Sequence, residues 1–284
     1  ALLNIYKSIV RPHLDYGDII YDKPNNNSFL KKKLETIQYN AALAITGAIR
    51  GTSMEKLNIE LGLECLGKRR WVRKMCFFQK LVNGLAPSYL TELLPPKQFS
   101  RNPSRQDLFS KFFTRTSYFA NSFFPNCVNN WNSLDCEIRN IKSPIVFKKT
   151  LLKFTRPKPA LVFDTLDNHG LKLLTRLRLG LSHLNDHKFK HNFRDTINPL
   201  CSCSLERETT KHFLLHCHHF VQHRKSLFDN LNNLHISLSN LSQDNIVNVL
   251  LFGDDILFDN EKNKNIINAT IVFIKSTERF SNSL

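Results

Sequence analysis

The residues best suited to chemistry are three cysteines and a histidine in the last third of the chain. Cys201, Cys203, His212 and Cys217 follow the pattern C-x-C-x8-H-x4-C. Three thiolates and one imidazole are typical ligands of a tetrahedral structural zinc site, and four protein ligands leave no position for a catalytic water. We therefore expect zinc here as a structural cofactor that holds the local fold together.

The spacing of this site leaves alternatives open. The one-residue gap between the first two cysteines is shorter than the gap of about two to four residues usual in zinc modules, and free cysteines are also common as ordinary buried residues. Three of the seven cysteines nevertheless lie within 17 positions beside a histidine, which favours a metal site. Which histidine binds is also open, because the same stretch contains His216, His218, His219 and His223.

A second set of histidines has a simpler explanation. His183, His187 and His191 are spaced by four residues, which places them on one face of a helix. Phe189 and Phe193 alternate with them, and no thiol or carboxylate completes a ligand set. We expect these histidines to be polar surface residues or hydrogen-bonding partners between helices, as is common for histidine.

Two adjacent aspartates near the end of the chain resemble part of a polymerase active site. Asp254 and Asp255 follow a Phe-Gly pair, as in hairpins that hold two catalytic metal ions. Such a site needs a third carboxylate on an upstream strand, and the sequence shows none in suitable surroundings. We therefore expect a turn or a helix cap here. The chain is predicted to contain no catalytic residue and no small-molecule site.

Composition and charge indicate a folded protein with a polyanionic partner. The 284 residues are enough for two domains, and 42% hydrophobic residues with 22 Phe can form a sizeable core. The net charge is +16, and residues 1–200 carry the whole basic excess, with 32 Lys and Arg against 15 Asp and Glu. Such a field attracts nucleic acid, although charge of this kind also serves solubility alone.

The sequence favours an intracellular protein without a membrane segment. No apolar run reaches the ~18 to 20 residues that a membrane span needs, and no secretory leader opens the chain. Thiolate metal ligands also require a reducing compartment. We expect the nucleus and the cytoplasm.

Apolar periodicity predicts a mainly α-helical fold. Residues 95–130, rich in Pro, Ser, Asn and Phe, predict an irregular connector with short strands. A helix is also expected to continue from Cys217 through Phe228. Further helices are expected from the start of the chain to just before Pro12, over 28–46, 53–61 and 66–81, from 143 onward, and over 170–180 and 263–280.

The helix over 66–81 mixes cations with aromatic residues. We expect Trp71 and Phe77 to be core residues in preference to platforms on which bases stack, since aromatic side chains are usually buried. The expected contacts to nucleic-acid phosphates are the cations of this helix and other basic residues along the chain: Lys31, Lys32, Lys33, Lys68, Arg69, Arg70, Arg73, Lys74, Arg176, Arg178, Lys188 and Lys190.

A series of short motifs runs along nearly the whole chain. Its members are YKSIVRPHLDYG at 6–17, the spaced Leu-Glu, Gln, Ala and Thr-Gly-Ala of 34–48, Leu-Gly-Leu at 61–63 with Arg-Arg at 69–70, Trp-Asn-Ser-Leu at 131–134 with Phe-Lys at 147–148, Thr-Arg-Leu-Arg at 175–178, Leu-Asn at 184–185, His-Lys-Phe at 187–189 and the cysteine-histidine segment 201–217. In this order and spacing they resemble the reverse transcriptases of non-LTR, LINE-type retrotransposons of the jockey-like group.

The resemblance implies that the chain corresponds to the part of such an enzyme that follows the palm. With the helical pattern, it predicts a thumb-like helical region at 1–94, a connector at 95–158 and a helical zinc-binding region at 159–284 with zinc on the four residues named above. It implies RNA template and target DNA as partners, together with the upstream polymerase and endonuclease regions. The palm aspartates are absent, so no polymerase activity carries over to a residue of this chain.

Three classes of function remain open at this point. The first is the non-catalytic, nucleic-acid-binding C-terminal portion of a retrotransposon RNA-directed DNA polymerase, which predicts binding that weakens steeply with salt. The second is a stand-alone structural zinc-bearing interaction protein, a retroelement remnant, which predicts a protein partner and little salt dependence. The third is a zinc enzyme, which the closed ligand set disfavours.

Overall fold

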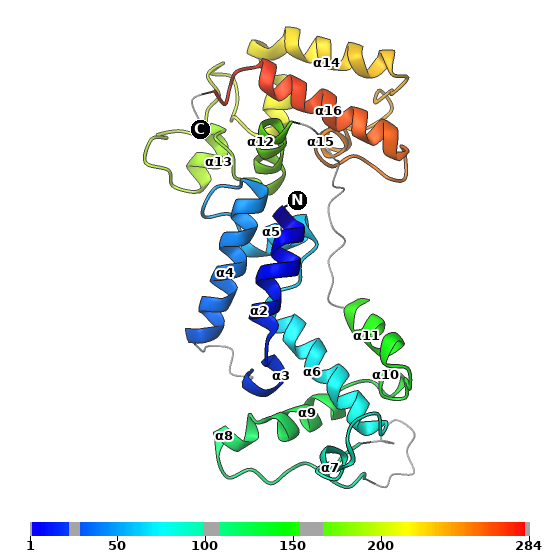
Figure 1. Ribbon diagram of the computed structural model, residues 1–284. Helices are drawn as coiled ribbons and strands as arrows, with labels where there is room; N and C mark the ends of the chain where they lie inside the picture. Colours follow the sequence, from blue (N-terminus) through cyan, green and yellow to red (C-terminus); the bar gives the residue numbers. More distant parts are fainter. Residues whose placement is uncertain (1, 23–28, 99–107, 154–166, 282–284) are drawn as a thin grey trace. The chain divides into compact units, whose positions relative to one another are not determined.

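The computed structural model describes residues 2–22, 29–98, 108–153 and 167–281 (Figure 1). This part of the chain is mainly helical, with 64% helix and no strand, which confirms the predicted mainly α fold. Extended backbone pairs there only in two isolated antiparallel bridges, between Lys97 and Phe109 and between Leu200 and Arg207. None of the described helices is long and apolar enough to span a bilayer.

The helices fall into two compact units. Unit 1 comprises residues 1–41 and 62–158, and unit 2 comprises 42–61 and 159–284. Unit 1 contains α1 (Leu2–Ile5), the π-helical η1 (Tyr6–Val10), α2 (Arg11–Asp15), α3 (Asp18–Tyr21), most of α4 (Phe29–Thr46), α6 (Leu66–Val82), α7 (Ser88–Thr91), α8 (Ser117–Ala120), α9 (Phe123–Asn132), α10 (Cys136–Arg139) and α11 (Pro144–Lys153). Unit 2 contains the end of α4, α5 (Met54–Leu61), α12 (Asn168–Leu179), α13 (Asn185–Lys190), the π-helical η3 (His212–His216), the 3-10 helix η4 (His218–Phe220), α14 (Val221–Asn233), α15 (Gln243–Phe252) and α16 (Asn260–Ser276).

The segment 42–61 packs with the C-terminal residues, whereas the expected division placed it inside a region at 1–94. Arg176 on α12 donates from Nε to the Gly47 carbonyl at 2.9 Å. Gly47 ends α4 with φ 65°, and a Cβ there would lie 2.5 Å from Cγ of Lys172. The grouping is set by such long-range contacts, which local sequence patterns do not reveal.

The N-terminal helix passes through Pro12 instead of ending before it. The N–H of Arg11 donates to the carbonyl of Tyr6, five residues earlier, which is the π-helical pattern. A regular helix resists proline because the ring has no N–H and clashes with the carbonyl four residues before it, and the wider π turn relieves this constraint. The helix therefore continues to Asp15, and Gly17, with φ 64°, turns the chain into α3.

Buried polar side chains join the N-terminal helix to α4 within unit 1. The Tyr6 hydroxyl donates to Oε1 of Gln38 at 2.7 Å, and Gln38 Nε2 donates to the Glu64 carbonyl at 3.0 Å. Burial raises the pKa of Tyr6 to about 12, so this hydroxyl remains a hydrogen-bond donor at neutral pH. Buried polar groups need such partners, and these bonds fix how the two helices pair.

The core of unit 1 forms where α6, α9 and α11 meet. Phe78 on α6 lies 5.5 Å from Trp131 on α9, and Trp131 lies 5.9 Å from Phe147 on α11, between ring centroids. All three side chains are fully buried. Trp71 and Phe77 pack partly buried against this cluster, as expected for core residues.

The connector is helical where short strands were expected. Its described residues contain the helices α8, α9, α10 and α11, and extended pairing among them is limited to the bridge between Lys97 and Phe109. Pro125 lies in the first turn of α9, where a helix does not need the missing N–H. The proline that indicated irregular structure therefore helps to begin a helix.

The core of unit 2 forms between α12, α14, α15 and α16, and α14 and α16 lie side by side (Figure 1). The ring of Phe213 lies 5.4 Å from Phe220 and Phe273 and 5.5 Å from Phe280, between centroids. Gly170 allows α12 to approach α16 closely, since a Cβ there would lie 2.2 Å from a side-chain methyl on α16. Because Phe213 belongs to η3, the core is continuous with the turn that carries His212.

Candidate metal centre

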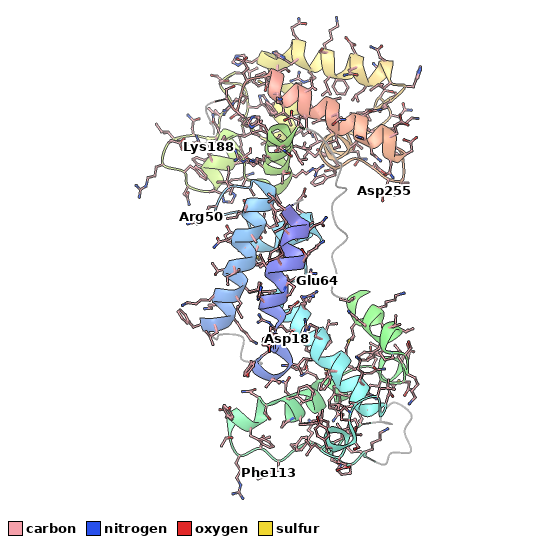
Figure 2. All side chains as sticks on the ribbon, in the orientation of Figure 1. Asp18, Arg50, Glu64, Phe113, Lys188 and Asp255 are labelled. Atoms are coloured by element: carbon pink, nitrogen blue, oxygen red, sulfur yellow. The ribbon has the colours of Figure 1, made fainter. Side chains whose placement is uncertain are left out.

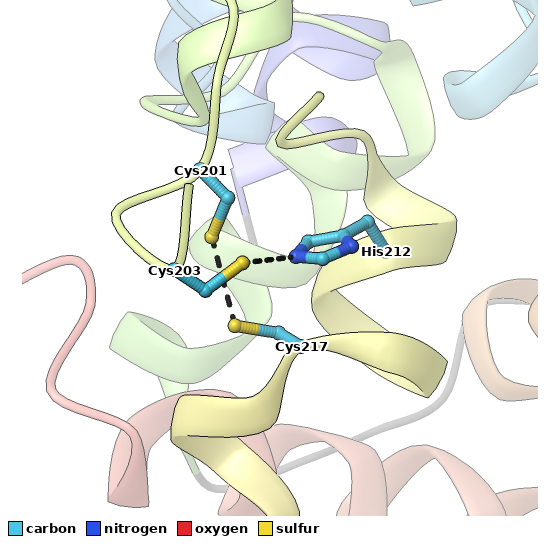
Figure 3. Close-up of side chains that lie close together, drawn as sticks. All are labelled: Cys201, Cys203, His212 and Cys217. Carbon is cyan, nitrogen blue, oxygen red and sulfur yellow. Dashed lines mark hydrogen bonds between the residues drawn. The ribbon is translucent and has the colours of Figure 1, made fainter. Parts of the chain in front are cut away.

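Cys201 and Cys203 lie on a tight loop that an isolated backbone bridge closes at its base. The N–H of Cys201 donates to the carbonyl of Glu206 at 2.9 Å, and the N–H of Ser204 donates to the carbonyl of Cys201 at 2.8 Å. Ser204 adopts the left-handed conformation, with φ 61°. This compact turn lets two thiols separated by only one residue face the same site (Figure 3).

His212 and Cys217 come from one wide turn. The N–H of Cys217 donates to the carbonyl of His212 at 2.8 Å, which spans five residues in the π-helical pattern. Cys217 then leaves the helical conformation, with ψ 125°. The helix expected to continue from Cys217 through Phe228 is therefore interrupted here, and it resumes in η4 and α14. Such π turns often mark functional sites, and they leave no distinct signal in apolar periodicity.

The four side chains converge with their ligand atoms facing one another (Figure 3). Cys201 Sγ lies 3.6 Å from Cys217 Sγ, and Cys203 Sγ lies 3.3 Å from His212 Nε2. All four ligand atoms lie within 4.8 Å of one another. In a tetrahedral site with Zn–S of about 2.3 Å and Zn–N of about 2.0 Å, ligand atoms are about 3.5 to 3.8 Å apart. The group can therefore hold a metal ion, and its separations are compatible with zinc.

Glu206 and Arg224 hold the candidate metal ligands in place. Nδ1 of His212 lies 3.1 Å from Oε2 of Glu206, so the proton of the ring belongs on Nδ1 and Nε2 faces the thiols. A carboxylate in this position is a common partner of a metal-binding histidine because it fixes the tautomer and the ring orientation. Arg224 donates to the carbonyls of Leu214 and Cys217, both at 2.8 Å, and so secures the end of the turn.

The thiols differ in their protonation. Burial raises the pKa of Cys201 to about 12, whereas the backbone N–H of Leu205 lowers the pKa of Cys203 to about 7. At neutral pH without a cation, Cys203 is therefore partly thiolate and Cys201 is protonated. A bound metal ion stabilises thiolates, so metal binding at this site releases protons.

The structure brings His212, and none of the other candidate histidines, to the thiols. In the part of the chain that the structure describes, no other group of three or more Cys, His, Asp and Glu side chains is close enough to share a metal ion. Nδ1 of His219 lies 3.2 Å from Ser202 Oγ, and Nδ1 of His223 lies 3.1 Å from Ser276 Oγ.

The histidines at 183, 187 and 191 do not share a helix face. Helix α13 begins after His183 and ends before His191. His187 is buried, with Nδ1 at 2.9 Å from Ser182 Oγ and Nε2 at 3.4 Å from Thr210 Oγ1. Burial lowers the pKa of His187 to about 4, so the ring is neutral at physiological pH. For His187, the expectation of a hydrogen-bonding role is met.

The paired aspartates after α15 form a turn. Asp254 Oδ1 accepts from the N–H groups of Ile256 at 2.8 Å and Leu257 at 3.0 Å. Gly253, with φ 70°, ends α15 just before them. Asp254 therefore has the turn-capping role expected from the sequence, and Asp255 is exposed beside it (Figure 2).

In unit 1, most of the basic residues expected to bind nucleic acid form ion pairs within the unit. Three buried or half-buried aspartates near the N-terminus accept them, and Figure 2 labels Asp18 at the start of α3. These aspartates were not identified as partners from the sequence, although their spacing of three and four residues, at 15, 18 and 22, could have indicated one acidic cluster. The pairs, at 2.8 to 3.7 Å, are Arg69 and Arg73 with Asp15, Arg73 with Asp18, and Lys31, Arg70 and Lys74 with Asp22.

The expected cations of unit 2 are also engaged, while three of unit 1 are open to solvent. Lys32, Lys33 and Lys68 are exposed, and the Lys33 ammonium lies 4.3 Å from the centroid of the Phe29 ring. In unit 2, Arg176 binds the Gly47 carbonyl, Arg178 pairs with Glu60 at 2.9 Å, Lys188 pairs with Asp195, and Lys190 pairs with Asp186 at 2.7 Å.

No protein-family model matches the chain, and neither a curated protein nor a solved structure matches it significantly. Assignment of a function therefore depends on the metal centre, the charges and the sequence motifs.

Proposed function

We propose that this chain is the nucleic-acid-binding, non-catalytic C-terminal portion of a non-LTR retrotransposon RNA-directed DNA polymerase, which holds the RNA template and the target DNA. The main support is the positive charge that remains after intramolecular pairing in unit 1. Around Asp15, Asp18 and Asp22, five cations face three carboxylates. The phosphates of RNA and DNA are the abundant polyanions that such a surplus binds.

The metal centre has a structural role in this proposal. Zinc on Cys201, Cys203, His212 and Cys217 has four protein ligands and no open coordination position, so it supplies no activated water. It fastens the cysteine loop to the turn that carries Phe213 into the core of unit 2. The resemblance of the motifs along the chain to LINE-type reverse transcriptases supports the same assignment, and polymerase activity belongs to regions outside this chain.

Salt dependence of binding tests the proposal. Fluorescence anisotropy with labelled RNA and DNA and the zinc-loaded full chain should give association constants that fall linearly with salt on logarithmic axes. For four or more phosphate contacts, the slope with single strands should be about −3 or steeper. Absence of binding, or binding that hardly changes with salt, contradicts the proposal and favours an interaction protein.

A further inference from the structure

A pocket lined by cations lies between the N-terminal helix and α6 in unit 1. It has a volume of about 390 Å³, and its charged lining consists of Lys7, Arg11, Asp15, Arg69 and Arg73. Three elements supply the cations: η1, α2 and α6. Arg73 also pairs with Asp18, so four positive side chains are balanced by two carboxylates, and a phosphate group can neutralise the positive charge that remains.

The cations of this pocket are crowded. Burial and the neighbouring Arg69 guanidinium both lower the pKa of Arg11. Arg69 and Arg73 share the same Asp15 oxygen, at 2.8 and 3.3 Å, and Arg73 also pairs with Asp18 at 3.1 Å. An anion bound among them would reduce this repulsion, and guanidinium groups bind phosphate oxygens through paired N–H donors.

A second, mainly apolar pocket adjoins the first. It has a volume of about 590 Å³ and shares Gly17 and Arg73 with the cationic pocket. Its walls include the aromatic rings of Phe77, Tyr118 and Phe123. Tyr118 is 74% exposed. Aromatic side chains of this kind stack with bases of any sequence because every base has a π face.

We propose that the two pockets together bind one unstacked nucleotide of a single strand, with its phosphate among Lys7, Arg11, Arg69 and Arg73 and its base against the aromatic wall. This inference rests on the proposed function and specifies the form of nucleic acid that unit 1 holds. In a duplex, the bases are paired and stacked inside the helix and do not reach such a pocket. Unit 1 therefore prefers single strands and discriminates little among bases.

A charge-matched pair of variants tests the site. Lys7→Gln/Arg11→Gln removes two charges from the cationic pocket, and Lys142→Gln/Lys149→Gln removes two exposed charges elsewhere in unit 1. Binding of the zinc-loaded full chain is measured by anisotropy with a labelled single strand of about 12 nucleotides and with a duplex of the same length. We expect the pocket variant to lose about tenfold in single-strand affinity and the control less than about threefold.

An aromatic variant tests the second pocket independently. Tyr118→Ala removes an exposed ring, so folding should be undisturbed, as circular dichroism would verify. Single-strand affinity should fall about fivefold while duplex affinity stays unchanged, because only an unstacked base uses the ring. Equal losses for the two charge variants, an unaffected Tyr118→Ala chain, or a duplex that binds as tightly as the single strand would overturn the site but leave nucleic-acid binding intact. A wild-type chain that binds neither nucleic acid would refute the proposed function itself.

Discussion

Replacing Arg178 by methionine should strongly destabilise unit 2. The side chains of Arg178 and Glu60 are 3% and 11% exposed, and their Nη1 and Oε1 atoms lie 2.9 Å apart. Arg178 also donates from Nε to the carbonyl of Leu251 and lies over the ring of Phe252, 5.5 Å from its centroid. Methionine retains much of the apolar contact of the arginine stem, but it leaves Glu60 buried without a cation.

The expected cost follows from the burial of the pair. Removing one partner of a buried ion pair costs about 3 to 5 kcal/mol, and the lost hydrogen bond to Leu251 adds about 1 kcal/mol. Glu60→Gln should cost less, about 2 kcal/mol, because Arg178 retains its carbonyl and ring contacts. The double variant Arg178→Met/Glu60→Leu should recover about 1 to 4 kcal/mol relative to Arg178→Met alone, since it removes the unpaired charge.

Urea unfolding of the zinc-loaded chain, followed by far-UV circular dichroism, measures these differences. The matched control is Lys275→Met, which removes an ion pair with Asp167 whose side chains are 46% and 34% exposed, and which should cost less than about 1 kcal/mol. If Arg178→Met cost no more than the control, or if the double variant recovered nothing, the packing of residues 42–61 against α12 would be wrong.

Three further predictions concern the metal centre, a buried histidine and a close helix contact. Cys217→Ser should abolish stoichiometric zinc and unfold residues around 195–225, because structural zinc contributes about 10 to 16 kcal/mol in small modules; unchanged zinc content and an unchanged melt would contradict this. Burial lowers the pKa of His187 from 6.5, its ordinary value, to about 4 in the folded protein. The stabilisation that the neutral ring provides is therefore fully present above pH 6.5, and up to about 3 kcal/mol of unfolding free energy is lost as pH falls toward 4. The unfolding free energies of wild type and His187→Asn should therefore converge over that range, and a constant difference would refute the assignment. Gly170→Ala should destabilise unit 2 by about 1 to 3 kcal/mol through its clash with α16, whereas Gly67→Ala, with nothing within 4 Å, should be neutral or slightly stabilising; equal melting curves for the two would contradict the close contact.

The sequence predicted the features that depend on neighbouring residues. The four residues that can hold a metal ion could be identified because residue type and spacing alone indicate the chemistry. The helix expected over 28–46 is observed as α4, Phe29–Thr46, and that expected over 66–81 as α6, Leu66–Val82, because apolar periodicity and terminal glycine are local signals.

Features that depend on distant residues were missed. The central cations of the basic helix α6 pair with aspartates 48 to 55 positions earlier in the chain, and these ion pairs were not predicted. The grouping of 42–61 with unit 2 likewise depends on bonds such as that between Lys56 Nζ and the Leu179 carbonyl, at 3.1 Å. The π turns at η1 and η3 are set by five-residue hydrogen bonds, which neither periodicity nor composition indicates.

Sequencing the transcript upstream of the codon for Ala1 tests most directly whether this chain is the nucleic-acid-binding portion of a retrotransposon polymerase. We expect the same open frame to encode a palm with paired aspartates, so that the two units described here hold template and target for that active site. An initiation codon just upstream, with no palm before it, would contradict this account and make the chain a stand-alone protein.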